Sequence, residues 1–217
     1  MVAVSATDLA RAERQTLCDL LDEHGPDAPT LCEGWSTRDL AAHLVVREGR
    51  PDAALGILGG PLAAWTERVQ SGAATEPYDK LIRLLRNGPP IWSQFRLPLV
   101  DGQANTVEFF VHAEDIRRAQ PDWQPRELDP ELAQFLWERL RSSAKMLFGR
   151  VKVGVSVRRT DVEDPETVKL RGGKSTVVLV GDPAELTMYA FGRKEHHVQL
   201  EGDQDAIDAL QAAKLGV

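Results

Sequence analysis

The hydrophobic periodicity of this chain changes once, near residue 151, and this change constrains the fold more than any other feature. Before it, apolar residues recur at the three- and four-residue spacings that are typical of amphipathic helices. From residue 151, the segment VKVGVSV alternates and is rich in valine, which indicates a β-strand. We therefore expect an α+β protein, with a helical domain over residues 1–150 and a small α+β domain over residues 151–217.

Serine caps and prolines mark the helices expected in the first domain. Ser5 and Ser36 each precede a helical pattern and have an aspartate three residues later, which is the capping-box arrangement. The second of these helices should end before Pro51, because the residue ahead of a proline is pushed out of helical geometry. The expected helices span residues 6–21, 37–49, 61–72, 78–88, 104–119 and 130–149.

The second domain is expected to contain strands separated by turns and two short helices. The segment RGGKSTVVLV contains Gly-Lys-Ser but is not a phosphate-binding loop, because position 168 is Val168 where that motif needs a glycine, and a strand follows rather than a helix. We interpret Gly172 and Gly173 as a hairpin turn. The expected strands are residues 151–157, 167–172, 175–181 and 196–202, and the helices are residues 182–192 and 203–215.

Composition excludes several classes of protein. The net charge of −7 argues against a nucleic-acid-binding surface, which needs a concentrated basic patch. No apolar run is long enough to span a bilayer and no secretory signal is visible, so we expect a cytoplasmic protein that binds a small molecule rather than a membrane. The two cysteines, Cys18 and Cys32, form no CxxC pair, and we interpret them as reduced thiols.

The helix at residues 104–119 places polar side chains where a core is expected. At about 100° per residue, Glu108, His112 and Asp115 fall on one stripe, flanked by apolar residues. A buried carboxylate is costly unless it is paired or bound to a cation. The opposite face, which we expect to be exposed to solvent, holds Thr106, Glu114 and Arg117.

A second inward stripe, on the helix at residues 37–49, holds His43 and Arg47. Two imidazoles and one carboxylate suit a first-row divalent metal and leave a coordination position open for water or substrate. Two interpretations without a metal stand beside this one. In one, His43 is an ordinary core histidine. In the other, Glu108 and His112 form a hydrogen bond with each other or pair with Arg47.

The segment PTLCEGWSTRDLAAHLVVRE resembles the signature of the DinB-like metalloproteins, and among them the mycothiol-dependent maleylpyruvate isomerase type. The resemblance implies an N-terminal four-helix bundle that binds a divalent metal, typically zinc, through His43, Glu108 and His112. The segment GDPAELTMYAFGR looks like part of the sterol-carrier-like domain that follows the bundle in that family. Mycothiol is the co-substrate that the resemblance implies.

These observations lead to three hypotheses of function. The first is a metal-dependent isomerase or transferase that uses a small thiol such as mycothiol. In it, Arg47 binds a substrate carboxylate or forms a salt bridge to an inward acid. Asp115 orients His112 or acts as a base, although we favour an ordinary helix-surface acid. The second hypothesis is a non-catalytic metal-binding or small-molecule carrier module, and the third is a polar core network without a metal.

Overall fold

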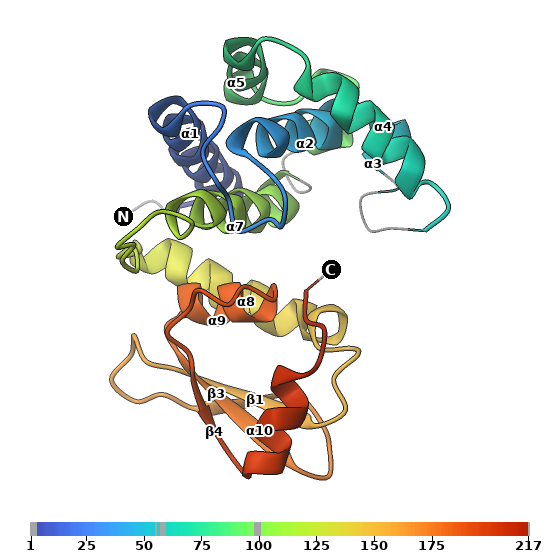
Figure 1. Cartoon of the computed structure of the whole chain (residues 1–217). Coiled ribbons are helices and arrows are strands. Elements are labelled where there is room, and N and C mark those ends of the chain that lie inside the picture. Colours follow the sequence, from blue (N-terminus) through green and yellow to red (C-terminus); the bar gives the residue numbers. More distant parts are fainter. Residues whose placement is uncertain (1–3, 55, 57–59, 98–100, 217) are drawn as a thin grey trace. The chain divides into compact units, whose positions relative to one another are not determined.

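The computed structural model describes residues 4–54, 56, 60–97 and 101–216. It confirms the α+β class, with helices throughout and one four-stranded sheet (Figure 1). The chain divides into two compact units, Met1–Gln124 and Pro125–Val217. This division lies earlier than the boundary at residue 150 suggested by the sequence, because the helix at Pro130–Leu147 packs into the core of the second unit.

The N-terminal unit is helical, and the expected capping boxes are present at Ser5 and Ser36. Its elements are α1 (Ala6–His24), α2 (Thr37–Gly49), α3 (Pro51–Ala54), α4 (Ala63–Ala74), α5 (Tyr78–Asn87), a 3-10 turn η1 (Gln94–Arg96), a π-helical turn η2 (Asp101–Asn105) and α7 (Thr106–Arg117).

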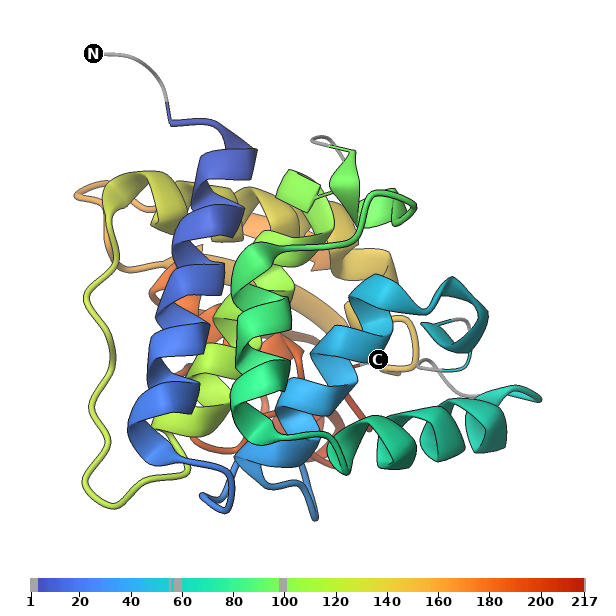
Figure 2. The ribbon, with the colours of Figure 1, turned by 90° about the horizontal axis from the view of Figure 1, so that it is seen from above.

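Four helices of this unit, α1, α2, α5 and α7, share one hydrophobic core. Figure 2 looks onto them with α1, α5 and α2 side by side. The core includes Leu17 of α1, Leu44 of α2, Leu85 of α5 and Phe109 of α7, each at most 1% exposed. Helix α4 packs on α2. The bundle therefore fixes α2 and α7, the two helices that carry the inward polar stripes.

The C-terminal unit packs three helices with a sheet. Val155 and Val157 of β1 and Val177 and Leu179 of β3 are fully buried in one core with residues of α8, α9 and α10. The elements are α8 (Pro130–Leu147), β1 (Gly154–Arg159), β2 (Thr167–Arg171), β3 (Thr176–Gly181), α9 (Pro183–Ala190), β4 (Gln199–Glu201) and α10 (Gln204–Gln211).

The strand order β2-β1-β3-β4 corrects the interpretation of Gly172 and Gly173 as a hairpin turn. Strand β1 lies between β2 and β3 and is parallel to β3, so the segment after β2 crosses the start of β1. A Cβ atom on Gly173 would collide with the backbone nitrogen of Gly154. A close backbone crossing thus explains why residue 173 is a glycine.

Among the described residues, no helix is long and apolar enough to cross a bilayer.

Candidate metal centre

The side chains that the sequence analysis selected as metal ligands converge between α2 and α7. His43 comes from α2, and Glu108 and His112 lie one turn apart on α7. Nε2 of His43 lies 3.5 Å from Oε1 of Glu108, and Nε2 of His112 lies 3.4 Å from the same oxygen. Nitrogen and oxygen ligands of a tetrahedral zinc ion are about 3.4 Å apart, given bonds of about 2.0–2.2 Å. These contacts therefore have the spacing that a small divalent ion requires.

The other nitrogen of each imidazole is held by a hydrogen-bond acceptor. Nδ1 of His43 lies 3.2 Å from Oε1 of Gln70 on α4, and Nδ1 of His112 lies 2.9 Å from Oδ2 of Asp115. Because each acceptor requires a proton on Nδ1, a neutral imidazole in this position keeps its lone pair on Nε2, which faces Glu108. Metal-binding histidines are commonly oriented in this way. The donor set therefore fits a divalent metal in chemistry as well as in spacing.

The protonation of this cluster shows how strongly the site favours a positive charge. Burial raises the pKa of Glu108, but the Arg47 charge and hydrogen bonds with the histidines outweigh it and hold the pKa well below the usual 4.5. Burial lowers the pKa of His112, but hydrogen bonds with Asp115 and Cys32 outweigh it and raise the pKa well above 6.5. Without a metal, a proton on His112 supplies the positive charge, and a divalent ion would compete with that proton.

Arg47 is directed at the same carboxylate. Its Nε lies 3.2 Å from Oε1 of Glu108, and its Nη1 donates to Oδ1 of Asn105. Its guanidinium lies over the ring of Phe95, 4.3 Å from the centroid. The salt bridge to an inward acid that the sequence suggested for Arg47 is therefore present. The Nη2 atom of Arg47 has no hydrogen bond with the residues that the structure describes.

A buried polar network continues behind Arg47, and local spacing in the sequence did not predict it. Asn105 donates from Nδ2 to Oε1 of Glu48, at 3.1 Å. Glu48 is in turn paired through both carboxylate oxygens with Arg14 of α1, at 2.6 and 2.7 Å. The network ties α1, α2 and the start of α7 together beside the candidate site. Glu48 follows Arg47 in the sequence, but only the packing of α1 on α2 shows that its face of the helix is buried.

Two expectations about α7 are wrong. Asp115, favoured as a helix-surface acid, is fully buried and bonded to His112. Thr106 and Glu114, expected on a solvent-exposed face, are also fully buried. The Glu114 carboxylate is tolerated in this buried position because it pairs with Arg118, whose side chain is equally buried. Nε of Arg118 lies 2.8 Å from Oε2 of Glu114. The helix is therefore enclosed on faces where the charged residues suggested solvent.

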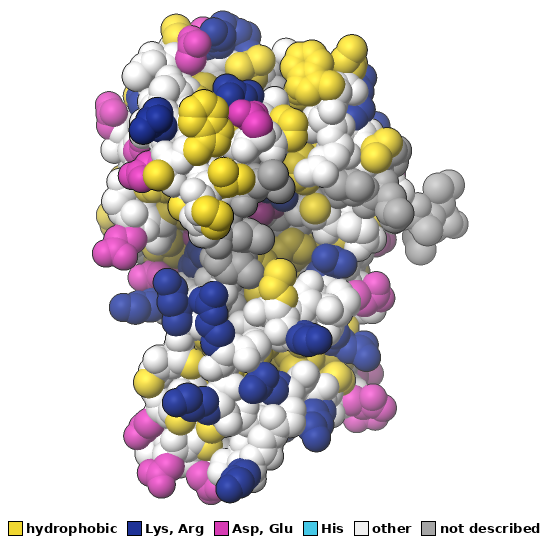
Figure 3. Space-filling view, turned by 90° about the vertical axis from the view of Figure 1, so that its right-hand side faces the viewer, with side chains coloured by type: hydrophobic (Ala, Val, Ile, Leu, Met, Phe, Trp, Pro, Cys, Tyr) yellow, Lys and Arg dark blue, Asp and Glu magenta, His cyan; other side chains and the backbone are white. Residues whose placement is uncertain are grey.

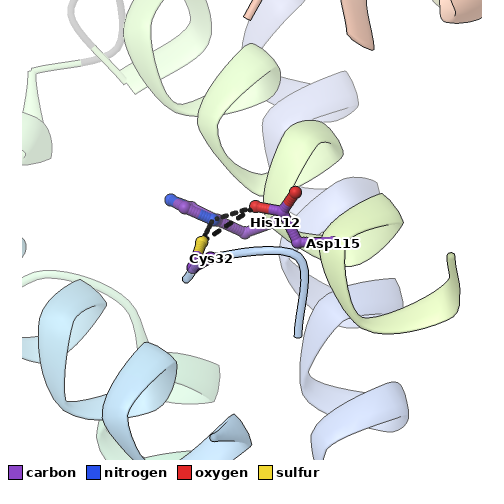
Figure 4. A group of neighbouring side chains, drawn as sticks. All are labelled: Cys32, His112 and Asp115. Carbon is purple, nitrogen blue, oxygen red and sulfur yellow. Dashed lines mark hydrogen bonds and ion pairs between the residues drawn. The ribbon is translucent and has the colours of Figure 1, made fainter. Parts of the chain in front are cut away.

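Cys32 has a more specific environment than the sequence suggested. Its Sγ donates to Oδ2 of Asp115 at 3.2 Å and lies 3.9 Å from Nδ1 of His112 (Figure 4). Cys32 is partly exposed as a residue, whereas Cys18 is buried in the bundle core. Burial raises the pKa of Cys18 to about 11. Neither cysteine forms a disulfide, and Cys32 lies beside the candidate site.

Fold and site together define a helical bundle that presents two histidines and a glutamate, joined to a small α+β unit. A sequence model described as the mycothiol maleylpyruvate isomerase N-terminal domain matches residues 7–136. The chain therefore belongs to the mycothiol maleylpyruvate isomerase N-terminal domain family.

Two solved structures share this fold. One is a mycothiol-dependent maleylpyruvate isomerase, with a TM-score of 0.61, and the other is a histidine-to-alanine variant of that enzyme, with a TM-score of 0.62. Each is 16% identical to this chain, and each comparison covers 90% of this chain and 91% of the other. At this identity the likeness establishes the fold alone. A comparison with curated proteins found no match.

Proposed function

We propose that this protein is a divalent-metal-dependent enzyme that uses a small thiol, such as mycothiol, in an isomerase or transferase reaction. One observation carries the proposal. The Nε2 atoms of His43 and His112 both face Oε1 of Glu108, while acceptors hold both Nδ1 atoms. Three protein ligands leave a fourth position for water, thiol or substrate, as in catalytic zinc sites. Zinc is the metal that we expect.

His43, Glu108 and His112 would hold the ion. When bound, a divalent ion lowers the pKa of a coordinated thiol and so supplies a thiolate nucleophile at neutral pH. Asp115 orients His112 by accepting a hydrogen bond from its Nδ1–H group. Arg47 holds Glu108 through Nε, and we expect its Nη2, which has no hydrogen bond with a described residue, to bind a substrate carboxylate. Membership of the family supports the use of mycothiol, and it makes maleylpyruvate the first substrate to test.

The experiment uses the full-length protein loaded with Co²⁺, whose absorption spectrum reports its ligands. We expect mycothiol to change this spectrum and to support turnover of maleylpyruvate or of another electrophile. His112→Ala should abolish both effects. Asp79→Asn should keep both, because this aspartate is exposed and pairs with Arg83, away from the candidate ligands. A Co²⁺ complex that mycothiol leaves unchanged, without thiol-dependent turnover, would contradict the proposal.

A non-catalytic carrier is the second candidate, and a groove in the N-terminal unit favours it. The groove has a volume of about 730 Å³, within the range of small-molecule sites, and its walls are mainly apolar. Figure 3 shows hydrophobic side chains gathering over the N-terminal unit on the face drawn. The lining residues include Val45, Trp65, Val69, Leu81, Leu84 and Trp92.

The groove does not include any of the three candidate metal ligands. A carrier should bind an apolar ligand there with the same affinity whether or not metal is present. The side chain of Glu108 is 23% exposed, so the candidate metal site is partly open, as an enzyme requires. We therefore favour the enzyme.

A further inference from the structure

His112 lies at the junction of two donor sets. Its Nε2 faces His43 and Glu108, and its Nδ1 faces Cys32 and Asp115. The second set combines a thiol, an imidazole and a carboxylate within 4.8 Å of one another. Figure 4 shows the three side chains directed toward a common point, with Cys32 reaching it from the loop ahead of α2 and the other two from α7.

The separations within the second set are close to those around a tetrahedral ion. Bonds of about 2.3 Å to sulfur and about 2.0–2.2 Å to nitrogen and oxygen place the ligand atoms about 3.4–3.6 Å apart. The observed separations are 3.9 Å from Sγ to Nδ1, 3.2 Å from Sγ to Oδ2 and 2.9 Å from Nδ1 to Oδ2. Each differs from the ideal by about 0.5 Å or less.

The loop that carries Cys32 is held in place against α7. The backbone nitrogen of Leu31 donates to the carbonyl oxygen of Asp115 at 3.0 Å. The Cys32 nitrogen donates to Oγ1 of Thr30 at 3.2 Å, and its carbonyl accepts from the nitrogen of Trp35 at 2.9 Å. The thiol therefore faces His112 and Asp115 as a result of a defined backbone, and little ordering is needed to bind an ion.

We propose that Cys32, Asp115 and Nδ1 of His112 form a second metal site, selective for soft, thiophilic cations such as Cd²⁺. Thiolate ligands favour soft ions, whereas the set of two histidines and a glutamate has no sulfur. On binding, the Cys32 thiol and the Nδ1–H group of His112 each release a proton to solvent, and the sulfur and Nδ1 bond to the ion while Nε2 keeps its proton. A neutral imidazole has one lone pair, so His112 serves one site at a time. A soft ion bound at Cys32 therefore takes His112 away from the first site and displaces the ion held there with His43 and Glu108.

The test is a titration of metal-free, full-length protein with Cd²⁺ alone. The readouts are the ultraviolet charge-transfer absorption between thiolate and Cd²⁺ and the cadmium content of the protein after desalting. We expect the band in wild type and in His43→Ala, because His43 belongs only to the first site. We expect Cys32→Ser to lose the band and to bind Cd²⁺ more than about tenfold more weakly, since even changes behind a ligand have that effect. Cys18→Ala is the matched control and should keep the band.

Four outcomes would overturn the proposal. They are no band in wild type, a band that persists in Cys32→Ser, a band lost in Cys18→Ala and a band lost in His43→Ala. In the last case the thiolate would belong to one site with His43. Circular dichroism and the thermal midpoint of each variant establish that the fold is intact. The proposed enzyme is tested separately, by the response of the Co²⁺ protein to mycothiol.

Discussion

Asp115→Asn tests whether the hydrogen bond between His112 and Asp115 orients the His112 imidazole for metal binding. The carboxylate of Asp115 is fully buried and accepts a hydrogen bond from Nδ1 of His112, with 2.9 Å between Nδ1 and Oδ2. An asparagine has nearly the same shape, but its amide is a weaker acceptor, and its NH₂ group can donate to Nδ1 instead. In that orientation the imidazole proton moves to Nε2, where it blocks the lone pair that faces Glu108.

The expected effect on metal affinity follows from the role of a hydrogen-bond acceptor in orienting a metal-binding histidine. Losing the acceptor behind a metal-bound histidine costs about 10–100-fold in affinity. That range corresponds to about 1.4–2.7 kcal/mol. The metal-free protein should also lose stability, because a hydrogen bond to a charged group contributes about 1.5–3 kcal/mol. The two effects must therefore be measured separately.

The assay is competition for Zn²⁺ between the protein and a chromophoric chelator, with the thermal midpoint of the metal-free protein measured in parallel. Asp79→Asn is the control, because it removes the charge of an aspartate whose side chain is 68% exposed and paired with Arg83. We expect its zinc affinity to equal that of wild type. A folded Asp115→Asn variant that binds Zn²⁺ as tightly as wild type would refute the orienting role.

Three further predictions follow from the same contacts. Because the pKa of His112 is raised above 6.5, its positive charge stabilises the metal-free protein fully below about pH 6.5, and this contribution is lost as the pH rises through the raised value. Thermal unfolding above about pH 6.5 should show this loss, while zinc affinity increases over the same range. Iodoacetamide should modify Cys32 but not Cys18 in the native protein, since Cys18 is buried and its pKa is about 11; mass spectrometry of peptides would show modification of Cys18 if this is wrong. Glu48→Ala should destabilise the fold by about 3–5 kcal/mol, because it leaves Arg14 buried without its carboxylate; chemical denaturation that finds no loss would refute this.

The helical periodicity of the sequence predicted that each of the three candidate ligands lies on an inward helical face, and the family resemblance implied that they form one site. Glu108 and His112 are four residues apart on a helix, and a capping box fixes the start of the helix that carries His43. These are local rules, and the structure agrees with them. They hold because the inward face of each helix is set by its apolar neighbours.

The partners behind those ligands could not be predicted, because they depend on tertiary packing. Gln70 reaches His43 from α4, and Cys32 reaches His112 from a loop 80 residues away in the chain. Neither contact has a signal in local spacing. The burial of Asp115 was missed for a different reason. Helical spacing placed it on the inward stripe with Glu108 and His112, but we favoured a surface position because charged residues are usually exposed.

The most direct test of the account is the metal content of wild type and His43→Ala, each purified without chelator and without a metal-affinity tag. We predict close to one equivalent of divalent metal per wild-type chain and its loss in His43→Ala, with the variant still folded. No metal in wild type, even after incubation with zinc, nickel or manganese, would contradict the central claim. His43, Glu108 and His112 would then be a structural network.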